Sequence, residues 1–167
     1  VEAGGIGALL DLASPSAALA LGSLAENGAS SKIVEAGGIG KLVELARIFL
    51  TPDGCDDLGW SAATALSKLA RFPGPAEAIK QAGGIEALVA LLSCKYAKER
   101  ECAAMALGNL ADHGLAYCTA IKEADGGSFA SLKKLTSTGG DKATAAMDAL
   151  GKIEAAELAA EAAAGAP

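Results

Sequence analysis

A short phrase recurs along the chain and restricts its fold more than any other feature. "VEAGGIG" occupies residues 1–7 and returns at 34–40, "KQAGGIE" follows at 80–86, and "KEADGGS" at 122–128 is a diverged copy. The alanine of the phrase recurs at intervals of 33, 46 and 42 residues. Repeats of this length that contain only helical patterns are typical of an α-solenoid, in which each unit packs on its neighbours.

The double glycine of the phrase lies between two apolar patterns with helical spacing. A longer helical pattern then closes each unit, ending in "ALGSLA" at 20–25, "ALSKLA" at 65–70, "ALGNLA" at 106–111 and "ALGKIE" at 149–154. Glycine adopts the left-handed conformation that ends a helix, and a second glycine lets the chain turn sharply into the next one. We therefore predict three helices per unit and no strands, with the double glycine as the hinge between the first and second helices.

The composition restricts the class of partner. The chain has 14 basic and 20 acidic residues, a formal net charge of -6, and only 4% aromatic residues. A surface with this charge repels phosphate backbones, so we expect no nucleic-acid partner. No apolar run approaches the roughly 20 residues that a membrane-spanning helix needs, so we expect no membrane span.

The cysteines and the single histidine do not form a metal-binding pattern. Cys55, Cys94, Cys102 and Cys118 include no CxxC pair, and His113 is the only histidine. A zinc site usually takes four ligands at short paired spacings, so we predict no metal. The simpler interpretation is four small, buried thiols in a reducing compartment. This favours an intracellular, cytoplasmic protein, or an organellar one if Val1 follows a removed targeting segment.

We also expect no catalysis and no cofactor. His113 and Cys118 are five residues apart, and no third group is placed to orient them as a nucleophile and a base. The glycines of the repeated phrase resemble the start of a dinucleotide-binding motif, but Leu10 and Val43 stand where its third glycine belongs.

The "EAGGI" hinge, the "LVALL" second helix and the "AAMALGNLA" third helix resemble armadillo repeats over nearly the whole chain. The resemblance implies an all-α fold, a right-handed alpha-alpha superhelix in which residues 1–167 form a single solenoid domain. About four repeats are expected, the first and last degenerate, with approximate bounds at 1–29, 30–74, 75–114 and 115–167. The second repeat carries an insertion around "FLTPDGCDD" at 49–57.

The armadillo resemblance also implies a function and a face. Such solenoids hold extended peptides or helices of partner proteins on a concave surface lined by their third helices. Peptide-binding members carry an asparagine at one position of the third helix. Here that position is occupied by Ser23, Lys68, Asn109 and Lys152. The position one turn earlier is occupied by Leu19, Thr64, Met105 and Asp148. Only Asn109 matches, and no tryptophan lies at the earlier position.

Trp60, the only tryptophan, lies two turns before Lys68 and is either an exposed anchor or a core residue that covers the insertion. Lys68 and Lys152 would add positive charge to the predicted face, and Asp148 negative charge. We predict a non-catalytic adaptor that binds a segment of a partner protein in the concave groove. The alternative is a structural subunit docked permanently against neighbouring subunits of a larger assembly.

Overall fold

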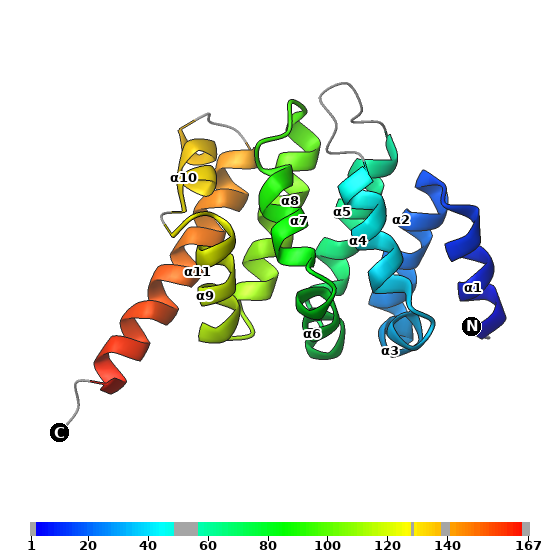
Figure 1. The fold of residues 1–167 in the computed structure, drawn as a ribbon, viewed down its shortest axis with the longest axis horizontal. Helices are drawn as coiled ribbons and strands as arrows, with labels where there is room; N and C mark the ends of the chain where they lie inside the picture. Colours follow the sequence, from blue (N-terminus) through cyan, green and yellow to red (C-terminus); the bar gives the residue numbers. More distant parts are fainter. Residues whose placement is uncertain (1–2, 49–56, 128, 138–140, 165–167) are drawn as a thin grey trace.

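The computed structural model describes residues 3–48, 57–127, 129–137 and 141–164, and within these ranges every regular element is a helix. The insertion predicted at 49–57 falls almost entirely outside the described residues. The elements, shown in Figure 1, are α1 (Ala3–Leu12), α2 (Pro15–Leu24), the short π-helix η1 (Ala25–Ala29), α3 (Ser30–Glu35), α4 (Gly38–Ile48), α5 (Asp57–Leu69), α6 (Pro73–Gln81), α7 (Gly84–Leu91), α8 (Ala97–Ala111), α9 (Leu115–Ala124), α10 (Ala130–Thr136) and α11 (Asp141–Ala164).

The double glycines form hinges between first and second helices, as predicted for the second and third copies. Gly37 and Gly83 have φ of 72° and 70°, in the left-handed region where a side chain is disfavoured. The next glycine begins the following helix at a close crossing. A Cβ on Gly84 would lie 2.6 Å from Ile79 Cγ2 and 2.8 Å from the Ile79 carbonyl oxygen. Both glycines of the phrase are therefore required, one for its backbone conformation and one for space.

The first copy of the phrase does not form a hinge, which corrects the prediction for this unit. Gly4 and Gly5 lie inside α1, and neither is among the glycines with positive φ. In this copy the glycines continue a helix instead of ending one. α1 and α2 correspond to the second and third helices of the other units.

The units stack side by side, and the third helices form the longest continuous contact. α2 packs on α5, α5 on α8 and α8 on α11. In Figure 1, α4 and α7 lie over this row, and α3 and α6 lie along the lower edge of the view. Small residues let the row pack closely, since a Cβ on Gly22 of α2 would lie only 3.0 Å from the Cα of Ala65 in α5. Each unit therefore buries its apolar face against its neighbours.

Two helix starts follow from local chemistry. α2 begins with Pro15 after the N-cap Ser14, whose hydroxyl accepts a hydrogen bond from the Ala17 N–H at 3.2 Å. α6 begins at Pro73, where the fixed φ of proline suits the first helical position, so this helix crosses the boundary predicted between 74 and 75.

A polar contact links the first helices of two consecutive units. The Tyr117 hydroxyl of α9 donates to Glu77 Oε2 of α6 at 3.0 Å, and the Lys80 ammonium lies 5.1 Å from the centroid of the tyrosine ring. The hydrogen bonds from Tyr117 and then from Gln81 lower the pKa of Glu77. Burial, followed by the bond to Glu77, raises the pKa of Tyr117. The stack is thus tied at the edge of the first helices as well as along the third helices.

Candidate partner-binding face

The residues predicted to meet a partner form a row across consecutive third helices. We call this row the third-helix face, and it consists of Ser23 and Leu19 on α2, Lys68 and Thr64 on α5, Asn109 and Met105 on α8, and Lys152 and Asp148 on α11. Each of these eight side chains is exposed or half-buried, and none belongs to the core. Because α2, α5, α8 and α11 contact one another in order, the face continues from one unit to the next.

Lys68 is held by the preceding unit. Its ammonium lies 2.8 Å from Glu26 Oε2, and the Arg71 guanidinium lies 3.5 Å from the other oxygen of the same carboxylate. Glu26 belongs to η1, directly after α2. Lys68 therefore faces solvent as half of an ion pair, which reduces the positive charge that the sequence suggested for this position.

Lys152 repeats the arrangement one step further along the stack. Its ammonium lies 2.9 Å from Asp112 Oδ2, just after α8, and 3.0 Å from Asp148 Oδ2 on its own helix. Burial acts to lower the pKa of Lys152, but its hydrogen bonds to Asp112 and Asp148 together outweigh burial and raise that pKa. The amine stays charged and is shared by two carboxylates, so the group of Lys152, Asp148 and Asp112 at the boundary between the third and fourth units carries a net charge of about -1.

Asn109 also reaches back to the preceding unit, a role that the sequence did not reveal. Its Nδ2 donates to the Ser67 carbonyl of α5 at 2.9 Å. Next to it, His113 Nε2 lies 2.7 Å from the Ala70 carbonyl, with which it shares a hydrogen bond. One amide proton of Asn109 is thus engaged within the protein, and among the described residues no partner is seen for its second amide proton or its carbonyl oxygen.

Trp60 is neither fully buried nor fully exposed, so its burial does not match either interpretation considered from the sequence in full. Its ring is half-buried, and the Lys98 ammonium of α8 lies 5.4 Å from the ring centroid. The Trp60 carbonyl accepts a hydrogen bond from the Thr64 hydroxyl at 2.8 Å, and that hydroxyl lies 3.3 Å from Cys102 Sγ. Trp60 therefore contributes contact area between α5 and α8 that a partner can still reach.

Met105 is the most accessible apolar residue of the third-helix face, at 45% exposure. A thioether side chain adapts readily to a partner surface. Beside it, Cys102 is a half-buried free thiol whose pKa is raised chiefly by burial. Cys102 is therefore mostly protonated at neutral pH and behaves as a small apolar residue.

Several contacts of this face were missed at the sequence level. Glu26 and Asp112 lie at equivalent places, three residues after the position of Ser23 and Asn109, so an alignment of the repeats would have identified them. The Ser67 carbonyl leaves no trace in a sequence, because every residue has one. The stacking of Lys98 on Trp60 depends on how two helices approach each other, and it too has no sequence signal.

The structure shows neither a metal cluster nor a catalytic pair in the described residues. No three His, Cys, Asp or Glu side chains among them gather as metal ligands would. His113 bonds the Ala70 carbonyl, while Cys118 is fully buried and bonds the Ala111 carbonyl at 3.8 Å. Each side chain is thus engaged by backbone rather than by the other.

The cysteines are not all free, contrary to the sequence interpretation. Cys102 and Cys118 are free thiols, whereas Cys94 is disulfide-bonded. Cys55 lies outside the described residues. The sequence interpretation inferred a reducing compartment from four free thiols. Because Cys94 forms a disulfide, it no longer supports that inference.

In the described part of the chain, none of the helices combines the length and the apolarity that crossing a membrane requires.

No protein-family model matches the sequence, and no curated protein matches it. Several solved structures match it. An engineered protein studied by a structural genomics consortium matches with a TM-score of 0.80 and 34% identity, over 92% of this chain and 64% of that one. A computationally designed armadillo repeat protein for modular peptide recognition matches with a TM-score of 0.75 and 25% identity, over 88% of this chain and 62% of that one.

A designed armadillo repeat protein in complex with the peptide (KR)4 matches with a TM-score of 0.76 and 26% identity, over 89% of this chain and 62% of that one. The chain spans less than two thirds of the length of each of these three proteins. Their shared architecture is the same stack of three-helix units described above. The chain therefore has an armadillo-like repeat fold, as the resemblance of its repeats predicted.

Proposed function

We propose that this protein is a non-catalytic adaptor that binds a segment of a partner protein along its third-helix face. The observation that carries the proposal is the continuous row of accessible side chains across α2, α5, α8 and α11. A row at the spacing of successive units suits an extended chain, because such a chain meets one unit after another.

The centre of the face, between α5 and α8, offers the best contact area. Trp60 and Met105 present accessible apolar surface there, and aromatic and flexible apolar groups commonly anchor interfaces. Asn109 keeps an amide proton and a carbonyl oxygen for hydrogen bonds to a partner's backbone. The ion pairs of Lys68 and Lys152 lie on either side of this centre. Their charges would fix how the partner segment is aligned along the face and would add little to its binding affinity.

The solved complex supports the class of partner. The designed armadillo repeat protein with bound (KR)4 shows that a solenoid of this architecture holds a peptide. By analogy we propose a protein partner for this chain, and no nucleic acid, given the net charge of -6.

The proposal is tested by Met105→Glu with Leu115→Glu as the matched control. Both side chains are exposed and apolar, at 45% and 43%, but Leu115 lies on α9, a first helix. Proteins captured from cell extract are crosslinked to the bait, and the crosslinked positions are mapped by mass spectrometry. We expect crosslinks on α5 and α8, loss of the captured partner with Met105→Glu, and retention with Leu115→Glu. Loss of the partner only with Leu115→Glu would place binding on the first helices and reject the proposal.

A second candidate, a subunit docked permanently in an assembly, is favoured by the two ends of the stack. Leu12 on α1 and Leu158 on α11 are each 66% exposed, and large apolar side chains at both ends suit neighbours packed end to end. Light scattering on the purified chain separates the two candidates. A monodisperse monomer that still captures its partner favours the adaptor, and association that Leu12→Ser and Leu158→Ser abolish favours the subunit.

The adaptor proposal includes no catalytic step, because neither His113 nor Cys118 has the geometry of a general base or a nucleophile. A cytoplasmic or organellar location is a prediction from the sequence alone, and the disulfide at Cys94 counts against the reducing compartment on which it rests.

A further inference from the structure

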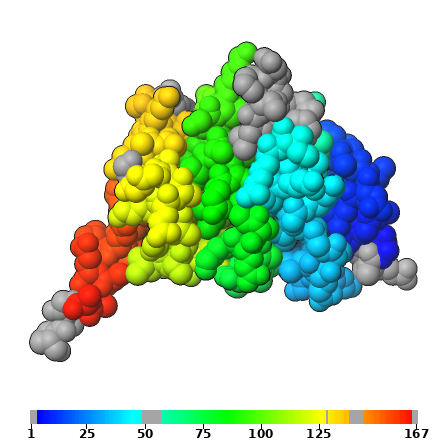
Figure 2. All heavy atoms as spheres, viewed as in Figure 1, coloured from blue at the N-terminus to red at the C-terminus, as the bar shows by residue number. Residues whose placement is uncertain are grey.

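A cavity of about 380 Å³ lies away from the third-helix face, between α10 and the turn that joins α7 to α8. Both elements lie along the upper edge of the molecule in Figure 1, and Figure 2 shows the same side with all atoms. The residues that line it are Leu92, Ser93, Cys94, Arg100, Ala130, Ser131, Lys134 and Leu135. From these residues we propose that the cavity binds a small organic oxyanion, a carboxylate or phosphate attached to a short apolar body.

The floor of the cavity is apolar. Leu92 and Leu135 are each 3% exposed and belong to the core, and Ala130 adds a third apolar surface at the start of α10. A cavity of this size and lining holds more than a bare inorganic ion, because it offers apolar surface to an uncharged part of a ligand. The floor therefore favours a ligand with several carbon atoms.

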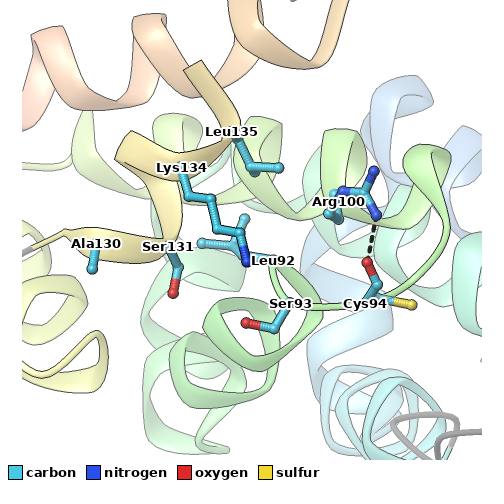
Figure 3. Close-up of a pocket in the computed structure, with 8 residues that line it drawn as sticks. All are labelled: Leu92, Ser93, Cys94, Arg100, Ala130, Ser131, Lys134 and Leu135. Atoms are coloured by element: carbon cyan, nitrogen blue, oxygen red, sulfur yellow. Dashed lines mark hydrogen bonds between the residues drawn. The ribbon is translucent and has the colours of Figure 1, made fainter. Parts of the chain in front are cut away.

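The wall of the cavity carries two cations. The Lys134 ammonium has no carboxylate partner among the described residues, and in Figure 3 its side chain extends towards Leu92 and Ser93. Arg100 is fixed in place because its Nη1 donates to the Cys94 carbonyl at 2.5 Å and to the Lys95 carbonyl at 2.7 Å. These bonds leave the Nη2 and Nε donors of Arg100 without an acceptor in the described part of the chain.

Two hydroxyls add to this excess of donors. Ser93 and Ser131 line the cavity, and Figure 3 shows their oxygens on the side to which Lys134 extends. Asp125, which does not line the cavity, accepts the backbone N–H of Ser131 at 3.0 Å. Hydrogen-bond donors and positive charge without matching acceptors are the features that recognise an oxyanion.

The charge of the whole molecule makes this site distinct. The chain carries a net charge of -6, yet the described wall of this cavity contains two cations and no carboxylate. Two cations without a carboxylate on the described wall favour an anionic ligand at this cavity. The site is independent of the proposed adaptor function, since no residue of the third-helix face lines it.

Hexanoate and hexyl phosphate are suitable probes, with 1-hexanol and inorganic phosphate as the two halves of the ligand tested separately. Binding is followed by the NMR shifts of leucine methyl groups assigned to Leu92 and Leu135. The test variant is Lys134→Met, and the control is Lys133→Met, an exposed lysine on the same helix that does not line the cavity.

We expect saturable methyl shifts with at least one of the two hexyl anions, and the preferred one identifies the head group as carboxylate or phosphate. Lys134→Met should weaken that binding about fivefold or more, the effect of losing one charged contact, while Lys133→Met leaves it unchanged. Three results would overturn the proposal: no saturable shift with either anion, equal binding of 1-hexanol, or equal loss in both lysine variants. Equal binding of inorganic phosphate would also reject it, because the apolar floor would then play no part.

Discussion

Replacing both hinge glycines of the third unit with alanine should destabilise the protein, although alanine is the better helix former. Gly83 has φ of 70°, a conformation that costs a residue with a Cβ about 1–2 kcal/mol. At Gly84 the new Cβ would lie 2.8 Å from the Ile79 carbonyl oxygen, a backbone atom that no rotamer change can move. The α6 to α7 crossing must therefore open.

The magnitude follows from opposing terms. Forcing extra atoms into a packed site typically costs about 1–3 kcal/mol. Alanine reduces the entropy of the unfolded chain and returns about 0.4–1 kcal/mol at each position. The net free energy of unfolding of Gly83→Ala with Gly84→Ala should then fall by about 2 kcal/mol, which lowers the Tm of a chain of this size by about 4–8 °C.

Thermal unfolding followed by circular dichroism measures this change, and Gly40→Ala is the matched control. Gly40 lies in α4 shortly after the equivalent hinge, and a Cβ there meets no atom within 4 Å. We expect the control to keep or raise the Tm, because alanine favours a helix interior over glycine by up to about 1 kcal/mol. A double variant as stable as the unchanged protein would show that neither the conformation of Gly83 nor the space at Gly84 constrains the hinge.

Two other predictions concern contacts between units. Asn109→Ala should lower the free energy of unfolding by about 1 kcal/mol, because the Ser67 carbonyl loses its donor. Urea denaturation measures this, and an unchanged midpoint would mean that water replaces the amide without cost. Tyr117→Phe should destabilise the protein at neutral pH and less so in acid. The pKa of Glu77 is lowered in the folded state, so the stability that this provides is present above the ordinary glutamate pKa and is lost as pH falls through the folded value. A difference in Tm between this variant and the unchanged protein that stays constant from neutral pH to acid would contradict the proposed role of the hydrogen bond.

The fold could be predicted from the sequence because the units repeat the same local sequence pattern. The phrase around Gly37 and Gly83 marks a helix end, a turn and the start of the next helix, and both copies form that hinge. The copy at Gly4 lies inside α1 without a positive φ, so the phrase alone does not specify a hinge. The repeated phrase therefore predicted the hinges at Gly37 and Gly83 correctly but not the structure around Gly4.

The sequence predicted that the residues of the third-helix face are accessible, but not the contacts that they make. Counting along the third helices placed Lys68 and Asn109 among accessible residues. Their bonds to Glu26 and to the Ser67 carbonyl each join residues 42 positions apart, and they depend on the offset between neighbouring helices. Helical periodicity gives the direction of a side chain from its own helix, but not the part of the next helix that it meets.

The side chains of the third-helix face that bond to the preceding unit also restrict the order in which the units can be joined. Lys68 pairs with Glu26 of the unit before it, and Lys152 pairs with Asp112 of the unit before it. The second unit carries Arg71 at the place that Asp112 occupies in the third. If the third unit were removed and the fourth joined directly to the second, Lys152 would meet Arg71, and an attraction would become a repulsion. The units thus share one shape but carry different charges at their joints, so shuffled or shortened versions of this chain would be disfavoured although every helix in them remains intact.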